Sequence, residues 1–147
     1  MAIRSILAVL LALSFAPVLD ADLKKALAEP DLGKRSKLAL DNAFAAYQAA
    51  HDAYQAGALE QVKAGIDEIE QSVDLAYQSL TDTGKDPRKS PRWFKSAELA
   101  TRDLTRRISS FQDQMSYSDR PLLDKVKSRV QQVHDDLLLG LMEGKKK

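Results

Sequence analysis

The sequence predicts an all-α protein, an antiparallel up-down four-helix bundle made of two similar helical hairpins. Two stretches, residues 59–73 and 123–137, place apolar residues three and four positions apart, which puts five apolar side chains on one face of a helix. Each stretch follows another long segment with the same spacing. Because such a face must be buried against another element, the four segments are expected to pack together.

The first hairpin is expected over about residues 31–80. A short helix in 22–30 ends at Pro30, because proline cannot continue a helix. Asp31 is the expected N-cap of a long helix that runs to about Gln55. The many alanines of this helix favour helix formation and let a neighbouring helix approach closely.

A second helix is expected from about Ala58 to Leu80. Gly65 lies inside it and costs about 1 kcal/mol relative to alanine. We expect Gly65 on the solvent face, and a close contact with another helix is the alternative.

The second hairpin is expected over about residues 91–144, after a polar connector in 81–90. Ser90 is the expected N-cap of the third helix, with Pro91 at its first position. Asp119 is the expected cap of the fourth helix.

Charged residues four positions apart are expected on the exposed side of the third helix. Glu98 precedes Arg102 and Asp103 precedes Arg107, which is the favourable order for such pairs. His134 lies one step off the apolar face of the fourth helix, so we expect it on a partly exposed flank.

The two hairpins repeat the same apolar pattern at a fixed offset, which takes Leu59 to Leu123 and Val62 to Val126. Few positions are identical, so duplication by descent is a hypothesis only. Two alternatives to the bundle remain: a short helical-repeat stack of the tetratricopeptide kind, and an open hairpin that completes its core as a homodimer.

Residues 1–21 have the features of a secretory signal peptide. Arg4 supplies a positive charge, residues 6–15 form a short apolar run, and Ala21 offers a small residue for cleavage. The run is too short to span a bilayer, so the mature chain, residues 22–147, is expected to be a single secreted or periplasmic helical domain without a transmembrane helix. An uncleaved N-terminal anchor is the alternative.

Composition excludes several classes of function. The chain has 147 residues and no cysteine, which excludes disulfides, a lipoprotein anchor, zinc–thiolate sites and covalently attached c-type haem. Its net charge of +1 argues against bulk electrostatic capture of nucleic acid.

Histidine offers little for metal or cofactor chemistry. There are two histidines, and neither belongs to the Glu-x-x-His motif of di-iron bundles. His51 with Met115 is the pair considered for a non-covalently held haem, because both lie on the expected core face. A structural histidine at the end of this face is favoured, and we expect no cofactor, no metal and no enzymatic activity.

The most concentrated charged feature is the connector with the start of the third helix. Its cations surround two aromatic residues, Trp93 and Phe94. The cations are Lys85, Arg88, Lys89, Arg92 and Lys95. Such a cluster can bind phosphate or carboxylate groups, with an exposed aromatic ring in contact with the partner. Trp93 falls on the apolar face, which favours instead an anchoring role in the core.

The sequence therefore favours an exported, non-enzymatic structural or interaction module of the cell envelope. It would bind an unknown protein or anionic envelope component through the basic connector and Trp93. The alternative is a periplasmic carrier of haem or a small apolar ligand in the bundle core.

Overall fold

The computed structural model describes residues 18–145, and these residues form helices and connecting turns without a strand. The helices are α1 (Val18–Ala28), α2 (Leu32–Gln55), α3 (Leu59–Asp82), α4 (Arg92–Gln114), the short 3-10 helix η1 (Arg120–Leu123) and α5 (Asp124–Glu143). The prediction of an all-helical protein with four long helices packed together is confirmed.

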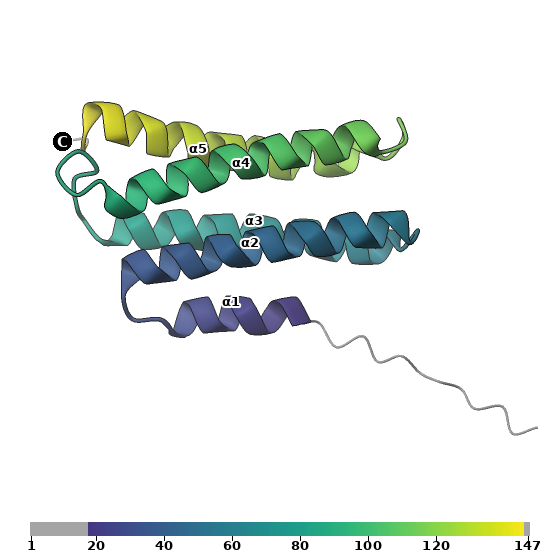
Figure 1. The fold of residues 1–147 in the computed structure, drawn as a ribbon, viewed down its shortest axis with the longest axis horizontal. Helices are drawn as coiled ribbons and strands as arrows, with labels where there is room; N and C mark the ends of the chain where they lie inside the picture. Colours follow the sequence, from purple (N-terminus) through teal and green to yellow (C-terminus); the bar gives the residue numbers. More distant parts are fainter. Residues whose placement is uncertain (1–17, 146–147) are drawn as a thin grey trace, which may run out of the picture.

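The helices form three layers (Figure 1). Helices α2 and α3 form the middle layer, α4 and α5 lie on one side of it, and α1 covers the other side, mainly against α2. Each hairpin is antiparallel, as its short turn requires.

The two hairpins are stacked with parallel helices facing each other, α2 beside α4 and α3 beside α5. Tyr47 donates to the backbone oxygen of Arg107, and His51 lies 3.0 Å from Gln114, so residue numbers rise together along α2 and α4. The connector passes from α3 to α4, which touch only slightly. The structure thus differs from the simple up-down order, in which each helix is antiparallel to both neighbours. A connector as long as Thr83–Pro91 can reach the diagonal position.

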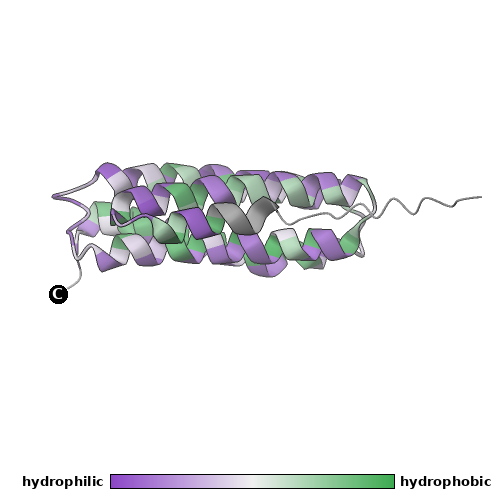
Figure 2. Ribbon diagram, turned by 90° about the horizontal axis from the view of Figure 1, so that it is seen from below, coloured by the Kyte–Doolittle hydropathy of each residue, from purple (hydrophilic) through white to green (hydrophobic). Residues whose placement is uncertain are grey.

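The apolar faces predicted from the spacing point into the core. Hydrophobic and hydrophilic residues are interspersed along the helices that Figure 2 shows in front. The buried members include Val62, Ile66, Ile69, Val73, Val126, Val130, Val133 and Leu137. Leu59 is the exception: it is 41% exposed because it is the first residue of α3, whereas Leu123 is fully buried.

One expected helix cap is confirmed, one is wrong, and Asp119 stands at the cap position of η1 and not of α5. Asp31 caps α2 as predicted, since its side chain accepts from the Lys34 backbone N–H at 2.9 Å. Helix α4 begins one residue later than expected, with Pro91 at the cap position, so Ser90 does not cap it. The Asp119 carboxylate accepts instead from the hydroxyls of Tyr54 and Ser116.

Gly65 is buried, which corrects its expected place on the solvent face. A Cβ atom there would lie 2.8 Å from the Cβ of Ala50 and 3.2 Å from the backbone oxygen of Ala46. The close helix contact that was the alternative is therefore the observed one.

Most of the predicted signal segment, residues 1–21, lies outside the described residues. Its last four residues belong to the first turns of α1. None of the helices within residues 18–145 is both long and apolar enough to cross a membrane.

Candidate functional site: the basic end of the bundle

The connector is held by hydrogen bonds around Asp86. The Asp86 carboxylate accepts from the backbone N–H of Arg88 at 2.9 Å. The backbone oxygen of Asp86 accepts from the N–H groups of Lys89 and Ser90. Pro87 lies against Gly140 of α5. The cations of the connector therefore project from an ordered turn.

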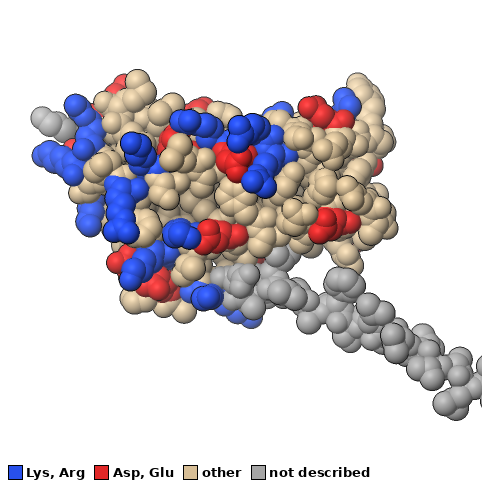
Figure 3. All heavy atoms as spheres, in the orientation of Figure 1, with Lys and Arg blue, Asp and Glu red and all other residues tan. Residues whose placement is uncertain are grey.

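The fold adds cations from distant parts of the sequence to this end, because α2 and α4 begin here and α3 and α5 end here (Figure 1). Lys145, beyond α5, donates to the backbone oxygen of Gly84 at 3.0 Å. Lys34 lies in the first turn of α2. We call the combined surface the basic end, and its members are Lys34, Lys85, Arg88, Lys89, Arg92, Lys95 and Lys145. Figure 3 shows Lys and Arg gathered at this end of the molecule.

The charges of the basic end act on Asp31. The pKa of the Asp31 carboxyl is lowered mainly because the Lys34 backbone N–H donates to it, with further lowering by the positive charges of Lys34 and Lys85. Asp31 and Lys85 also line the same hollow, so the connector lies next to the start of α2.

Most of the described cations outside the basic end have carboxylate partners. On the helix bodies, seven cations form salt bridges with carboxylates: Lys37, Lys63, Arg102, Arg106, Arg107, Lys125 and Arg129. Within the described part of the chain, no carboxylate lies within salt-bridge distance of Lys85, Arg88, Lys89, Arg92 or Lys95. Unneutralised positive charge is therefore concentrated at this end.

The two aromatic residues have different roles. Phe94 is buried and anchors the start of α4 in the core. Trp93 is partly buried and packs over Gly33, where a Cβ atom would overlap the indole Nε1. The Arg92 guanidinium carbon lies 4.6 Å from the Trp93 ring centroid, in a cation–π contact. Trp93 is therefore both an anchor and part of the basic surface.

Two hollows flank the connector. One, of about 360 Å³, lies between the ends of α3 and α5, and Leu137 and Gly140 are among its lining residues. The other, of about 500 Å³, lies between the starts of α2 and α4. Lys85, Leu80 and Phe94 line both. Both volumes fall within the range of small-molecule sites, about 300–1,000 Å³.

His51 and Met115 lie at the opposite end of the bundle. The Nε2 atom of His51 is 3.0 Å from the Oε1 of Gln114, and its ring lies 5.1 Å from that of Phe111. Met115 is buried at the end of α4. His51 is thus hydrogen-bonded to the side chain of Gln114. Residues 18–145 contain no group of three or more His, Cys, Asp or Glu side chains arranged to hold a metal ion.

A buried ionic cluster between α4 and α5 escaped prediction. Glu98 is 3% exposed, although its pairing with Arg102 suggested the solvent face. Its Oε1 lies 2.9 Å from the Nε2 of His134 and 3.0 Å from the Nε of Arg102. The other ring nitrogen of His134 lies 3.1 Å from Asp135, whose pKa is lowered chiefly by this hydrogen bond. The expected exposed position of Glu98 is therefore wrong, whereas His134 is partly exposed, as its place beside the apolar face predicts.

This cluster fastens the two helices of the second hairpin together. Glu98 can be buried because two positively charged or N–H-bearing groups surround its carboxylate. The signal in the sequence was weak: Glu98 follows Ala97 on the apolar face by one position, as His134 follows Val133.

No family model, curated protein or solved structure matches the chain. The proposals below therefore depend on the residues alone.

Proposed function

We propose that this chain is an exported, non-enzymatic helical protein that binds an anionic partner through its basic end. The partner would be a component of the cell envelope, either a phosphate- or carboxylate-bearing surface or an acidic protein, and the protein would be secreted or periplasmic. The helices would serve as a rigid frame for the connector.

The observation that carries this proposal is the clustering, at one end of the bundle, of cations without a carboxylate partner. On the helix bodies, seven cations are neutralised by carboxylates of the same chain, and three others, Arg35, Arg120 and Lys127, are hydrogen-bonded to backbone or amide oxygens. The five cations of the connector and the start of α4 have no such carboxylate in the described part of the molecule. Positive charges held together on an ordered turn repel one another, and an external anion relieves this repulsion.

The ordered connector supports the same proposal. Asp86 holds the turn by accepting hydrogen bonds from three backbone N–H groups, one at its carboxylate and two at its backbone oxygen, so its carboxylate is already bonded inside the connector. Asp31 is used in the same way at the start of α2. The carboxylates at this end therefore shape the surface and leave its cations available to a partner.

The test replaces Lys85, Arg88, Lys89 and Arg92 together by serine. These side chains are exposed, so the variant should fold normally and keep its thermal unfolding temperature within a few degrees. We expect co-sedimentation with anionic vesicles or with wall sacculi to fall at least about tenfold, because several charge contacts are lost together.

The matched control replaces Lys37, Lys63, Arg106 and Lys125 by serine, which changes the net charge equally but removes cations of the helix bodies. This control should retain most of the binding. If both variants bound vesicles or sacculi equally, or if the connector variant bound them as well as the wild type, the basic end would be ruled out as the binding surface.

A carrier of haem or of a small apolar ligand in the core, through His51 and Met115, is the second function considered from the sequence. No specific observation favours it: His51 is hydrogen-bonded to Gln114, and the two hollows lie at the other end of the bundle.

A further inference from the structure

The hollow between the starts of α2 and α4 is built mainly from apolar groups. Leu80 and Phe94 are the buried hydrophobic residues of its lining, and Leu32, Pro91 and Trp93 add further apolar surface. A solvent-filled apolar hollow of about 500 Å³ is unfavourable, because its surface stays in contact with water. An apolar group that enters it would release that water.

The charged residues of this hollow favour an anion. Lys85 and Arg92 line it and are exposed. Asp31 also lines it, but its carboxylate accepts from the Lys34 backbone N–H, and its lowered pKa keeps it ionised as a cap. The two cations have no carboxylate within salt-bridge distance in the described residues, so positive charge prevails beside the apolar surface.

Gly33 lets Trp93 form one side of the hollow. Because it has no side chain, the Trp93 indole can lie directly on the backbone of α2. Arg92 stacks on Trp93, which holds the guanidinium beside the apolar surface instead of leaving it free in solvent. Apolar and cationic groups are thus placed within one small site.

We propose that this hollow binds a single-chain anionic amphiphile, an acyl carboxylate or phosphate monoester. Its chain would occupy the apolar surface, and its anionic head would lie between Lys85 and Arg92. The inference rests on the proposed function and makes it more specific, because an extended polyanion would need only the surface charge and would leave the hollow empty.

Trp93 provides a direct measurement, since it is the only tryptophan of the chain. Decanoate is titrated into the purified protein below its micelle concentration, and the fluorescence of Trp93 is followed. We expect a saturable blue shift with one decanoate per chain. Decyltrimethylammonium, decanol and inorganic phosphate, each tested alone, should bind at least about tenfold more weakly, because each lacks one of the two features.

Two kinds of variant test the two halves of the site. Lys85→Gln with Arg92→Gln should weaken decanoate binding about tenfold, whereas Lys63→Gln with Arg106→Gln should not. Ser90 lines the hollow and is exposed, so Ser90→Leu should fill space and weaken binding without loss of charge. Ser110→Leu, on the exposed side of α4, is its control.

The outcomes separate this inference from the proposed function. One outcome is that anionic vesicles bind through the connector cations while Trp93 does not respond to decanoate. This outcome would overturn amphiphile binding in the hollow and leave the proposed function intact. Decanoate binding that Ser90→Leu or the Lys85 and Arg92 changes do not alter would also overturn it. A response to decanoate with no vesicle or sacculus binding would support the hollow while contradicting the broader surface.

Discussion

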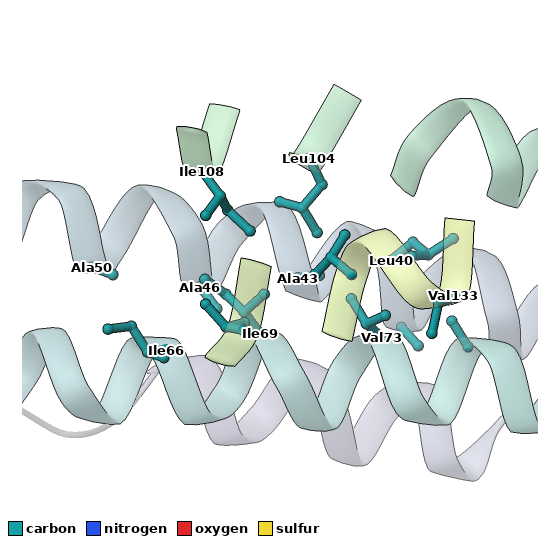
Figure 4. Close-up of a cluster of buried hydrophobic side chains, with 14 of the residues drawn as sticks. Leu40, Ala43, Ala46, Ala50, Ile66, Ile69, Val73, Leu104, Ile108 and Val133 are labelled. Atoms are coloured by element: carbon teal, nitrogen blue, oxygen red, sulfur yellow. The ribbon is translucent and has the colours of Figure 1, made fainter. Parts of the chain in front are cut away.

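The two hairpins have similar lengths and the same apolar spacing, but they pack differently. In the first, small residues allow α2 and α3 to approach closely, with Gly65 against Ala46 and Ala50. In the second, the side of α4 that faces the core carries large buried residues, Leu104, Ile108 and Phe111. Figure 4 shows the small side chains of α2 next to Ile66 and Ile69, with Leu104 and Ile108 approaching from α4.

The difference follows from position in the stack. Helices α2 and α3 form the middle layer, and α2 contacts α1, α3 and α4, with α1 packed mainly on α2. A helix with neighbours on three sides needs small side chains where they come closest, whereas an outer hairpin fills the space toward the middle layer with large ones. The first hairpin should therefore be sensitive to added volume and the second to lost volume.

The largest effect is expected from lost volume in the second hairpin. Phe111 is 1% exposed and packs edge-to-face on Tyr47 and Tyr54. Phe111→Ala should lower the free energy of unfolding by about 3–5 kcal/mol, since it leaves a cavity in the core. Urea denaturation followed by circular dichroism measures this loss.

The matched position of the first hairpin is Tyr47, whose ring is partly buried and whose hydroxyl bonds to the backbone oxygen of Arg107 at the rim. Tyr47→Ala should cost less, about 1–2 kcal/mol. Equal losses at the two positions would contradict the difference between the hairpins.

An intermediate effect is expected from added volume in the first hairpin. Alanine in place of Gly65 gains about 1 kcal/mol of helix propensity. It also forces a Cβ atom to 2.8 Å from the Cβ of Ala50, and overpacking of this kind costs about 1–3 kcal/mol. Gly65→Ala should therefore lower the free energy of unfolding by about 1 kcal/mol, as measured by urea denaturation.

The adjacent Ala64 is exposed, so Ala64→Gly measures helix propensity without packing. If Gly65→Ala raised stability by the amount that Ala64→Gly lowers it, α2 and α3 would not be in close contact at Gly65.

The sequence predicts which face of each helix is buried but not which helix covers it. The spacing of Ile66, Ile69, Val130 and Val133 determines a face, and all four side chains are buried there. The parallel stacking of the hairpins depends on where the connector leads, and periodicity carries no information about that. Gly65 was misplaced for the same reason, because its environment depends on Ala46 and Ala50 of another helix.

The candidate site could be predicted only where its residues are consecutive. Lys85, Arg88 and Lys89 are close together in the sequence, and in the structure they lie on the ordered connector. Lys34 and Lys145 join them only because the ends of α2 and α5 meet the connector in space. The burial of Glu98 was hidden because its partner His134 belongs to the other helix of the hairpin.

The smallest effect concerns the exposed ionic pairs of the two hairpins. On α4, Asp103 accepts from Arg106 at 2.7 Å and from Arg107 at 3.0 Å, and these hydrogen bonds lower the pKa of its carboxyl below the ordinary 3.8. On α2, Lys37 precedes its partner Asp41, which is the less favourable order. Asp103→Asn should cost about 0.5–1 kcal/mol at pH 7, and Asp41→Asn less.

The pH dependence of the stability that Asp103→Asn removes identifies the cause of the effect. A carboxyl with a lowered folded-state pKa stabilises the fold above its unfolded pKa, and this contribution disappears as the pH falls through the folded pKa. In urea titrations, the difference between wild type and Asp103→Asn should therefore be constant from pH 7 to about pH 5 and vanish near pH 2. A difference that persists at pH 2 would show that the side-chain volume or the helix propensity of Asp103, and not its ion pairs, supports the outer hairpin.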